Sequence, residues 1–317
     1  MSYCTNVKED ILKVNSDASS HLVELEACLR LGAEVVISNP IRLIYSTSNM
    51  HVIRYFITLI KKFYIDVEYQ LISRKLQKLN RQTIYSCVIT KGSKTMIEEL
   101  GLLEPITPRK DEILESTILT CAYLKGAFIT KGSVNDPKTS NYHLELCTSK
   151  ELEAFFLQRA LNIFELNARI AKRRSNLIVY LKEKDKIVDC LRYMGANVSM
   201  NEFENTIIQR DISAHINRQV NIDIANQQKT NKSAKEQIKY IKYLEANYPT
   251  EKLDDKLKIV MKVRKENPEA SLTELINLIH ETYDSKITKS GLNHRLRKIK
   301  EIALDFDARR KKHEDRN

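Results

Sequence analysis

Two parts of the chain, about one hundred residues apart, repeat the same order of hydrophobic and polar positions. The segments Asn49–Phe63 and Lys150–Phe164 both carry apolar residues at i, i+3, i+4 and i+7, which is typical of a helix that buries one face. Each follows a strand-like run, Arg42–Ser48 or Tyr142–Ser149, whose closing Thr-Ser pair stands where a helix N-cap belongs. The matched pattern predicts a tandem repeat of one structural unit.

The remaining elements of the two units also match. A helix rich in small residues opens each unit, at Leu22–Val35 and at Leu119–Val134. A helix that ends in glycine closes each unit, at Gly101 and Gly195, where we expect a left-handed C-cap. Strand pairs lie between them, at Asp66–Ile72 with Thr83–Thr90 and at Asn167–Arg173 with Asn176–Lys182. Each unit therefore reads helix, two strands, helix, two strands, helix, and two such units side by side form one α+β body with a pseudo-two-fold axis.

Composition changes twice along the chain. Glu104–Glu112 holds two prolines and a run of charges, so we place the boundary between the two units there. From Asn205 to Ala246 the sequence is polar and rich in Asn and Gln, with Ile, Val and Leu at helical spacing. We interpret this stretch as a helical connector that ends near Tyr248 and Pro249. Apolar residues that recur at helical spacing are not typical of a disordered segment.

Three short helical segments follow between Glu251 and Ala303, in the outline of a helix-turn-helix. The first stops at Pro268, and the second begins with a capping box formed by Ser271 and Glu274. We expect a turn over His280–Ile287 and a third helix capped by Thr288. Its apolar stripe is Leu292, Leu296, Ile299 and Ile302.

The third helix has the chemistry of a recognition helix. Asn pairs with adenine and Arg with guanine in the DNA major groove, and both residue types lie in the first half of this helix. The alternative is a solvated basic helix, which would carry the same charges. We name as the candidate DNA-binding residues Thr288, Lys289, Ser290, Asn293, His294, Arg295, Arg297 and Lys298. A flexible basic tail that includes Arg309, Arg310, Lys311 and Lys312 adds nonspecific phosphate contacts at most.

The charge balance favours a polyanionic partner. The net charge is +11 and the pI is near 9.2, so Lys and Arg are available to neutralise phosphates. The six cysteines show no C-x-x-C pair and no nearby histidine cluster at metal spacing, so we interpret them as reduced core thiols and expect no metal and no cofactor. No apolar run has the length of a membrane span and no signal core opens the chain, so we expect a cytoplasmic protein with no membrane partner.

Three long motifs resemble the WhiA family of bacterial transcription regulators, which are linked to sporulation, cell division or chromosome upkeep. They are Tyr123–Leu146, Arg210–Thr230 and Lys289–Ile299. The resemblance implies tandem repeats similar to LAGLIDADG homing endonucleases, with mixed helices and antiparallel sheets, followed by an all-α helix-turn-helix domain similar to region 4 of sigma factors. We accordingly expect a first LAGLIDADG-like repeat at 1–106, a second at 107–204, the helical connector at 205–249, the helix-turn-helix domain at 250–306 and the basic tail at 307–317.

The same resemblance bears on catalysis. In LAGLIDADG nucleases two helices each end in an acid that binds a metal ion for strand cleavage, and that hydrolysis needs both carboxylates. If Leu25 and Leu124 occupy the first position of the motif, Gly32 and Lys131 stand where the acids would be. Neither binds Mg²⁺, and Lys131 is instead suited to contact a phosphate. The small residues Ala27, Gly32, Gly126 and Ala127 are expected to let the two helices approach closely.

We therefore expect a non-catalytic, nucleoid-associated regulator that binds double-stranded DNA in a sequence-specific way. Its body adds affinity or contacts a protein such as RNA polymerase or another regulator. Basic strand residues either line a saddle-shaped DNA face or form a solvated rim: Arg74, Lys75, Lys78, Arg81, Lys172, Arg173 and Arg174. Two alternatives stay open, a metal-dependent nuclease that uses Glu34 and Asp136, and an adaptor that binds another protein and touches DNA weakly.

Overall fold

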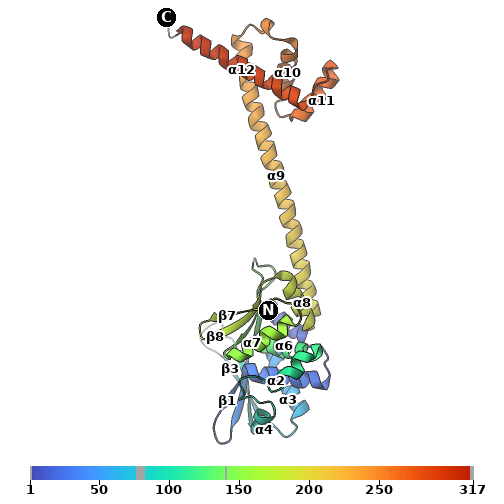
Figure 1. Ribbon diagram of the computed structural model, residues 1–317, viewed down its shortest axis with the longest axis vertical. Helices are drawn as coiled ribbons and strands as arrows, with labels where there is room; N and C mark the ends of the chain where they lie inside the picture. The colour runs from blue at the N-terminus through green and yellow to red at the C-terminus, as the bar shows by residue number, and fades with distance from the viewer. Residues whose placement is uncertain (1, 76–82, 140, 315–317) are drawn as a thin grey trace. The chain divides into compact units, whose positions relative to one another are not determined.

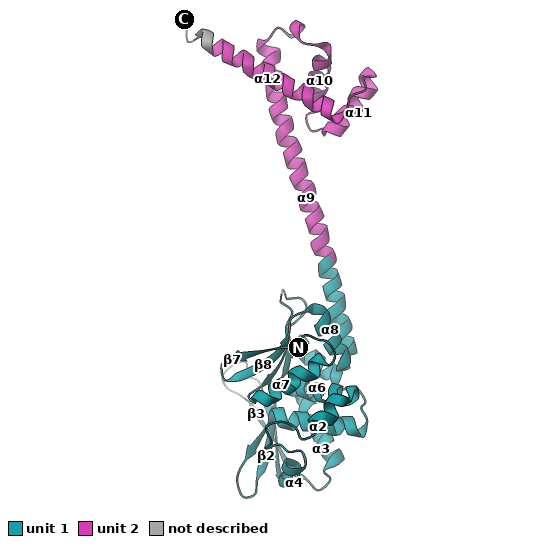
Figure 2. Cartoon of the chain, in the orientation of Figure 1, with its two compact units in different colours: residues 1–211 teal, residues 212–317 magenta. Residues whose placement is uncertain are grey.

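The chain forms two compact units in a computed structural model, residues 1–211 and residues 212–317 (Figure 2). The structure describes residues 2–75, 83–139 and 141–314, apart from the side chains of residue 250 and residues 312–314. Lys78 and Arg81, which were predicted to lie on the saddle face, are outside the described residues.

The first unit is built from the predicted tandem repeat. After α1 (Tyr3–Ile11), the first repeat comprises α2 (Ala18–Gly32), β1 (Ala33–Val36), β2 (Arg42–Thr47), α3 (Met50–Phe63), β3 (Glu68–Lys75), β4 (Thr83–Lys91) and α4 (Ser93–Glu99). After α5 (Lys110–Glu115), the second comprises α6 (Thr117–Lys131), β5 (Gly132–Val134), β6 (Leu144–Thr148), α7 (Glu151–Asn162), β7 (Arg169–Arg173), β8 (Asn176–Leu181) and α8 (Lys184–Tyr193).

Each repeat forms its own four-stranded antiparallel sheet. The strand orders are β1-β2-β4-β3 and β5-β6-β8-β7, so the two sheets have the same topology. Both lie on one side of the helices of this unit (Figure 1). The α+β class with mixed helices and antiparallel sheets is therefore confirmed.

The predicted ends of four helices were wrong, namely those of α2, α6, α3 and α7. Val35 and Val134 belong to strands β1 and β5, because the opening helices end at Gly32 and Lys131 and the chain pairs at once with β2 or β6. The Thr-Ser pairs are not N-caps. Asn49 caps α3 by accepting from the backbone N–H groups of two residues in its first turn, while the N-cap of α7 is Lys150, which makes no side-chain cap bond. Asn competes well with Ser for this position, so the one-residue shift costs little.

Helices α2 and α6 pack against each other in the centre of the unit. A Cβ built on Gly126 would lie 2.5 Å from the backbone oxygen of Glu24 and 2.8 Å from the Cβ of Ala27. Only glycine permits this approach, as was predicted for Ala27 and Gly126. Gly101 and Gly195 have φ values of 53° and 79°, in the left-handed conformation expected at the ends of the closing helices.

One helix, α9 (Asn197–Asn247), runs from the first unit into the second. Its first backbone N–H groups are capped from another element, because Asp10 of α1 accepts from Val198 and Ser199 at 2.9 and 3.0 Å. Every side chain from residue 211 to residue 229 is exposed. The predicted helical connector is thus one continuous helix, while the domain boundaries given above stay predictions.

The second unit packs three further helices on the end of α9. They are α10 (Asp255–Glu266), α11 (Leu272–Tyr283) and α12 (Lys289–Glu314), with a short 3₁₀ turn, η1 (Thr250–Lys252), before them. Their core includes Ile241 and Leu244 of α9. The capping box of Ser271 and Glu274 is present with both bonds.

Two predictions for this unit were wrong in extent. His280–Tyr283 continue α11, and the turn begins only at Asp284, whose φ of 46° ends the helix. The stretch expected to be a flexible tail continues α12 to Glu314. Contacts with α9 hold this extension, because Tyr243 donates to Asp307 at 2.9 Å and Arg310 donates to Asn247 at 2.8 Å.

Candidate nucleic-acid interface

The start of α12 is held in a defined position. Thr288 accepts from the backbone N–H of Gly291 at 3.1 Å, which confirms the predicted cap. Leu292, Leu296 and Ile299 are buried against the other helices of the unit, and Ala303 extends the same stripe. Ile302, predicted to be buried, is half-buried because Ala303 takes the position that faces the core. The opposite face of the first three turns therefore points to solvent.

The candidate DNA-binding residues divide into two groups on this helix. Asn293 and Arg295 are half-buried, on the two flanks of the apolar stripe. The exposed members are Thr288, Lys289, Ser290, His294, Arg297 and Lys298. The most accessible face of α12 therefore carries hydroxyl, imidazole, guanidinium and ammonium groups, all of which are hydrogen-bond donors to DNA.

A groove of about 280 Å³ lies between α12 and α9. Asn293 and Arg297 line its α12 side together with Lys300, and Gln237 and Tyr240 line its α9 side. Lys300 Nζ lies 5.4 Å from the centre of the Tyr240 ring. The Gln237 side-chain oxygen is buried and has no hydrogen-bond partner among the described residues. The groove thus connects the candidate recognition helix to α9.

A buried arginine orients the turn between α10 and α11, and sequence reasoning missed it. Arg264 is fully buried and donates to the backbone oxygen of Ala270 at 2.6 Å. Burial lowers the pKa of its guanidinium by desolvation. In the sequence it resembles the surrounding exposed basic residues, so only the helical face on which it lies indicated its burial.

In the first unit, α2 and α6 end at Gly32 and Lys131, the two residues aligned from the sequence with the acids of LAGLIDADG nucleases. A Cβ on Gly32 would lie 2.4 Å from Thr130 and 2.7 Å from the Tyr45 ring. An aspartate at this position would therefore displace both side chains. Lys131 is exposed at the end of α6 and lines a cavity of about 120 Å³ with Arg30, Lys150 and Asn176. This end of the helix pair is basic, whereas a metal site needs acids.

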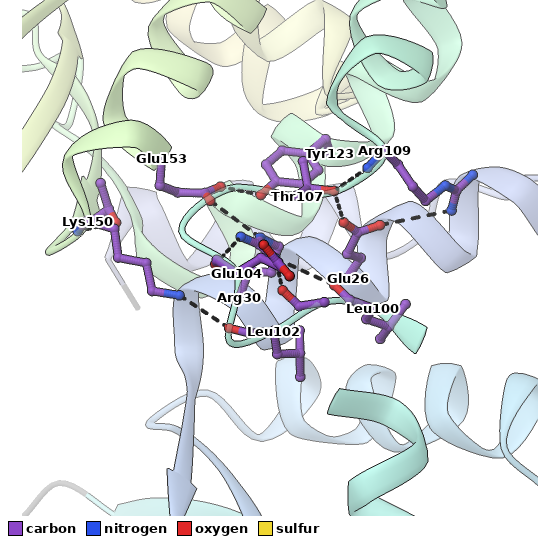
Figure 3. Close-up of polar contacts among 12 residues, drawn as sticks. Glu26, Arg30, Leu100, Leu102, Glu104, Thr107, Arg109, Tyr123, Lys150 and Glu153 are labelled. Atoms are coloured by element: carbon purple, nitrogen blue, oxygen red, sulfur yellow. Dashed lines mark hydrogen bonds and ion pairs between the residues drawn. The ribbon is translucent and has the colours of Figure 1, made fainter. Parts of the chain in front are cut away.

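A buried charged network lies beside this helix pair, and sequence reasoning missed it as well (Figure 3). Arg30 of α2 pairs with Glu153 of α7 at 3.4 Å and donates to the backbone oxygens of Gly101 and Glu104 at 2.7 and 3.0 Å. Tyr123 of α6 donates to the same Glu153. The network joins both repeats and the chain that connects them, and charged residues on an otherwise apolar helix were its only signal.

Glu26, also buried in this region, has one carboxylate oxygen without a hydrogen bond among the described residues. Thr107 donates to one of its carboxylate oxygens, and Arg109 lies 3.9 Å from the other. Burial therefore raises the pKa of Glu26, although the Thr107 hydrogen bond and Arg109 oppose the shift.

A second buried pair lies near the middle of α2 and α6. Lys125 of α6 and Glu24 of α2 are 2.9 Å apart, and Lys125 also donates to Ser16 at 3.1 Å. The pair forms part of the wall of a cavity of about 630 Å³ that opens between the first turns of α2 and α6. Both charges are compensated inside the protein, which is the condition for burying them.

Glu34 and Asp136, the two acids of the alternative nuclease hypothesis, lie on different elements. Glu34 is exposed on β1, and the Asp136 carboxylate, in the loop after β5, accepts from the backbone N–H of Lys138 at 2.8 Å. Within residues 2–75, 83–139 and 141–314, the structure brings together no group of three or more His, Cys, Asp or Glu that would hold a metal ion.

The strand register separates the basic residues predicted for the saddle. Arg173 pairs with Asn176 and points away from the helices, whereas Lys172 pairs with Leu177 on the helix side. Arg174 lies in the hairpin turn with a φ of 57°. Arg173 also contacts Glu145 at 3.3 Å.

The outer face of the two sheets, meaning the strand positions that point away from α2 and α6, has little charge. By alternation with the buried strand residues, its charged members among the described strands are four arginines and two glutamates: Arg42, Arg74, Arg169, Arg173, Glu34 and Glu145. Aliphatic residues lie between them, including Ile44, Ile72 and Ile178. This face is much less basic than the second unit.

Family models match nearly the whole chain in three segments. The WhiA N-terminal LAGLIDADG-like domain matches residues 18–103, the WhiA LAGLIDADG-like domain matches residues 120–213 and the WhiA C-terminal HTH domain matches residues 216–303.

Related proteins match over the same length. A probable cell division protein WhiA of Staphylococcus carnosus (strain TM300) is 36% identical over 307 residues, 96% of both chains. That of Staphylococcus aureus (strain JH9) is 35% identical over the same share. The crystal structure of a full-length WhiA from Thermatoga maritima is similar in fold, with a TM-score of 0.60 and 23% identity over 96% of this chain and 99% of that one.

Fold and comparisons together define the class of protein: a LAGLIDADG-like α+β body joined to a C-terminal helix-turn-helix unit. The chain belongs to the WhiA family. Across the part of the chain that the structure describes, no helix has both the length and the apolar character needed to span a membrane.

Proposed function

We propose that this protein is a sequence-specific DNA-binding transcriptional regulator that reads bases with α12. One observation carries the proposal: the first three turns of α12 are fixed by a cap and a buried stripe, while their free face is polar and basic. We propose as base and phosphate contacts Thr288, Lys289, Ser290, Asn293, His294, Arg295, Arg297 and Lys298. The exposed His294 and Arg297 are the side chains best placed to reach base edges.

We further propose that the body is not a catalyst. The absence of space for an acid at Gly32 and the ammonium group at Lys131 support this reading. Purified protein incubated with supercoiled plasmid and Mg²⁺ should leave the plasmid intact. Nicking that disappears in the Glu34→Gln, Asp136→Asn double variant would instead support the nuclease.

The weakly charged outer face of the sheets suits a protein partner better than a DNA duplex. We propose that this face contacts RNA polymerase or another regulator. We propose secondary DNA contacts from Lys131 at the end of α6 and from Lys172, Arg173 and Arg174 at the end of β7 and in the turn after it. Relatives that are named probable cell division proteins support genes of cell division as targets. We propose genes of chromosome segregation or sporulation as further targets, together with association with the nucleoid.

A binding selection on random and genomic duplexes tests the main proposal. Wild type should enrich a defined motif, and His294→Ala, Arg297→Ala should lose it, since each base contact contributes roughly 1–3 kcal/mol of discrimination. Lys256→Ala, Lys262→Ala on α10 is the matched control and should keep the motif, because those side chains are exposed on another helix. Enrichment of no motif by wild type would favour the adaptor reading, and an unchanged motif in the α12 variant would place recognition elsewhere.

A further inference from the structure

The C-terminal half of α9 carries a row of lysines that the recognition helix does not account for. Five of them are exposed: Lys229, Lys232, Lys235, Lys239 and Lys242. None is in an ion pair with another residue that the structure describes, whereas Lys258 and Lys265 of α10 pair with Asp255 and Glu245. A row of like charges that the fold leaves uncompensated costs stability unless an anion compensates it.

Helix geometry places these lysines on one side of α9. At about 100° per residue, Lys232, Lys235, Lys239 and Lys242 fall within a sector of about 80°, and Lys229 lies about 60° beyond Lys232 on the same side of the helix. The lysine face, as we call this set of five residues, lies opposite the buried Ala234, Ile241 and Leu244. Glu236 is the single acid between residues 224 and 244. The core of the second unit thus fixes the direction of the face.

The lysine face adjoins the candidate recognition helix. The groove between α9 and α12 is lined by Ser233, Glu236 and Tyr240 from α9 and by Arg297 and Lys300 from α12. Basic groups line the α12 side of this groove, and on its α9 side the lysine face begins beyond Ser233 and Glu236. The same face continues toward the start of α9 with the exposed amides Asn221 and Gln228, and Asn and Gln side chains also bind phosphate oxygens.

We propose that the lysine face of α9 is a second DNA-binding surface, which contacts backbone phosphates next to the site that α12 reads. This inference rests on the proposed DNA-binding function and assigns a role to α9, which precedes the three helices α10, α11 and α12. The lysines span about 20 Å of helix, and a DNA duplex presents one phosphate charge per roughly 1.7 Å of axis, so several phosphates lie within their reach.

An anionic membrane is the competing partner for a basic helix. A helix that lies on a bilayer inserts an apolar face beside its basic face. Along the lysines, the opposite side of α9 is occupied by the core of the second unit, since Ile241 and Leu244 have no exposed surface. The exposed Ile212, Ile216 and Val220 lie on turns of α9 before the lysines. DNA backbone requires no such apolar face, which is why we favour it.

The test compares variants of the full chain on a selected duplex and on a random-sequence duplex over a range of salt. In Lys232→Gln, Lys235→Gln, Lys239→Gln, both affinities should fall roughly ten- to hundredfold and the slope of log K against log salt should drop by about 0.9 per lost phosphate contact. Sequence preference should not change. The Lys→Arg triple variant at the same positions should keep wild-type affinity, which separates charge from folding.

A control removes the same charge from the first unit. Lys94→Gln, Lys110→Gln, Lys138→Gln changes exposed residues of α4, α5 and a loop, and should leave affinity and slope unchanged. An equal loss in this control would mean that net charge alone matters and would overturn the inference. Unchanged affinity and slope in the α9 variant would also overturn the inference. So would wild-type binding to phosphatidylserine vesicles, if the α9 variant loses that binding but still binds DNA as wild type does.

The outcomes for α9 and α12 are separable. If the α12 variant loses its motif while the α9 variant behaves as wild type, the inference fails and the proposed function stands. If wild type binds neither duplex, both fail.

Discussion

Glu26 shows how a single buried acid links stability to pH. Its folded pKa is raised by burial above the ordinary value of 4.5, so the folded state holds this proton more tightly than the unfolded chain. The contribution to stability is therefore most favourable below 4.5 and is lost as pH rises through the folded pKa. Thr107 offsets part of this cost by donating to the carboxylate.

We predict that Glu26→Gln removes this pH dependence. The amide oxygen still accepts from Thr107, and no charge is buried at neutral pH. Urea unfolding across about pH 4 to 8 should give a wild-type stability that declines relative to the variant as pH rises. The exposed Glu115→Gln is the control and should follow wild type. A variant whose stability relative to wild type is constant over this range would contradict the assignment.

Gly126 sets how closely the two central helices approach. Gly126→Ala should destabilise the first unit by about 1–3 kcal/mol or more, because the new Cβ meets the backbone oxygen of Glu24, which cannot move without shifting α2. Gly291→Ala in α12 is the matched control. The nearest atom there is Thr288 Oγ1 at 3.3 Å, so its stability should stay near that of wild type. Equal thermal shifts in the two variants would contradict the close-packing argument.

Among the elements, α9 begins with a cap that comes from far away in the sequence. Asp10→Ala should leave two backbone N–H groups of α9 without their acceptor and cost about 1 kcal/mol, with faster hydrogen exchange in the first turn of the helix. Asp10→Asn keeps an acceptor oxygen and should lose less. If exchange at the first turn were the same in both variants and in wild type, Asp10 would not be the cap.

Helices and strands were predicted correctly where the interactions that determine them lie within a few residues of one another in the sequence. Amphipathic periodicity and the capping box of Ser271 and Glu274 act within a few residues, and both were found in the sequence. The extension of α12 to Glu314 depends on contacts of its last turns with α9, so the basic composition of that stretch suggested a tail. The Arg30 and Glu153 network joins residues from both repeats, and no local pattern marks such a pairing.

For the candidate site, the sequence predicted the helix, its cap and its buried face, but not the exposure of each side chain. The apolar stripe of α12 indicated which face is buried, and Thr288 was correctly placed as the cap. The partial burial of Asn293 depends on α9, which lines the groove beside it, and helical spacing alone does not reveal such a neighbour. Likewise, the separation of Lys172 from Arg173 required the strand register.

At the scale of the whole molecule, each unit has a hydrophobic core of its own, and only α9 passes from one to the other. Residues 211–229 of that helix are exposed on all sides, so no tertiary packing supports this stretch. An isolated helical segment with no buried face is close to the limit of stability in water. We therefore predict that limited trypsin digestion cuts first at Arg218 or Lys229 and leaves two folded fragments.

The second core also predicts where the C-terminal fragment must begin. Ile241 and Leu244 of α9 are fully buried in it, and Ala234 is buried about two turns before Ile241 in the same helix. A fragment of residues 229–317 should therefore unfold cooperatively in a thermal melt followed by circular dichroism. A fragment of residues 250–317 lacks both aliphatic side chains, which are worth roughly 2–5 kcal/mol each when removed from a core, and should be largely unfolded. Equal stability of the two fragments would mean that α9 contributes nothing to this core. The helix-turn-helix would then fold without α9, the helix that lines the groove beside α12.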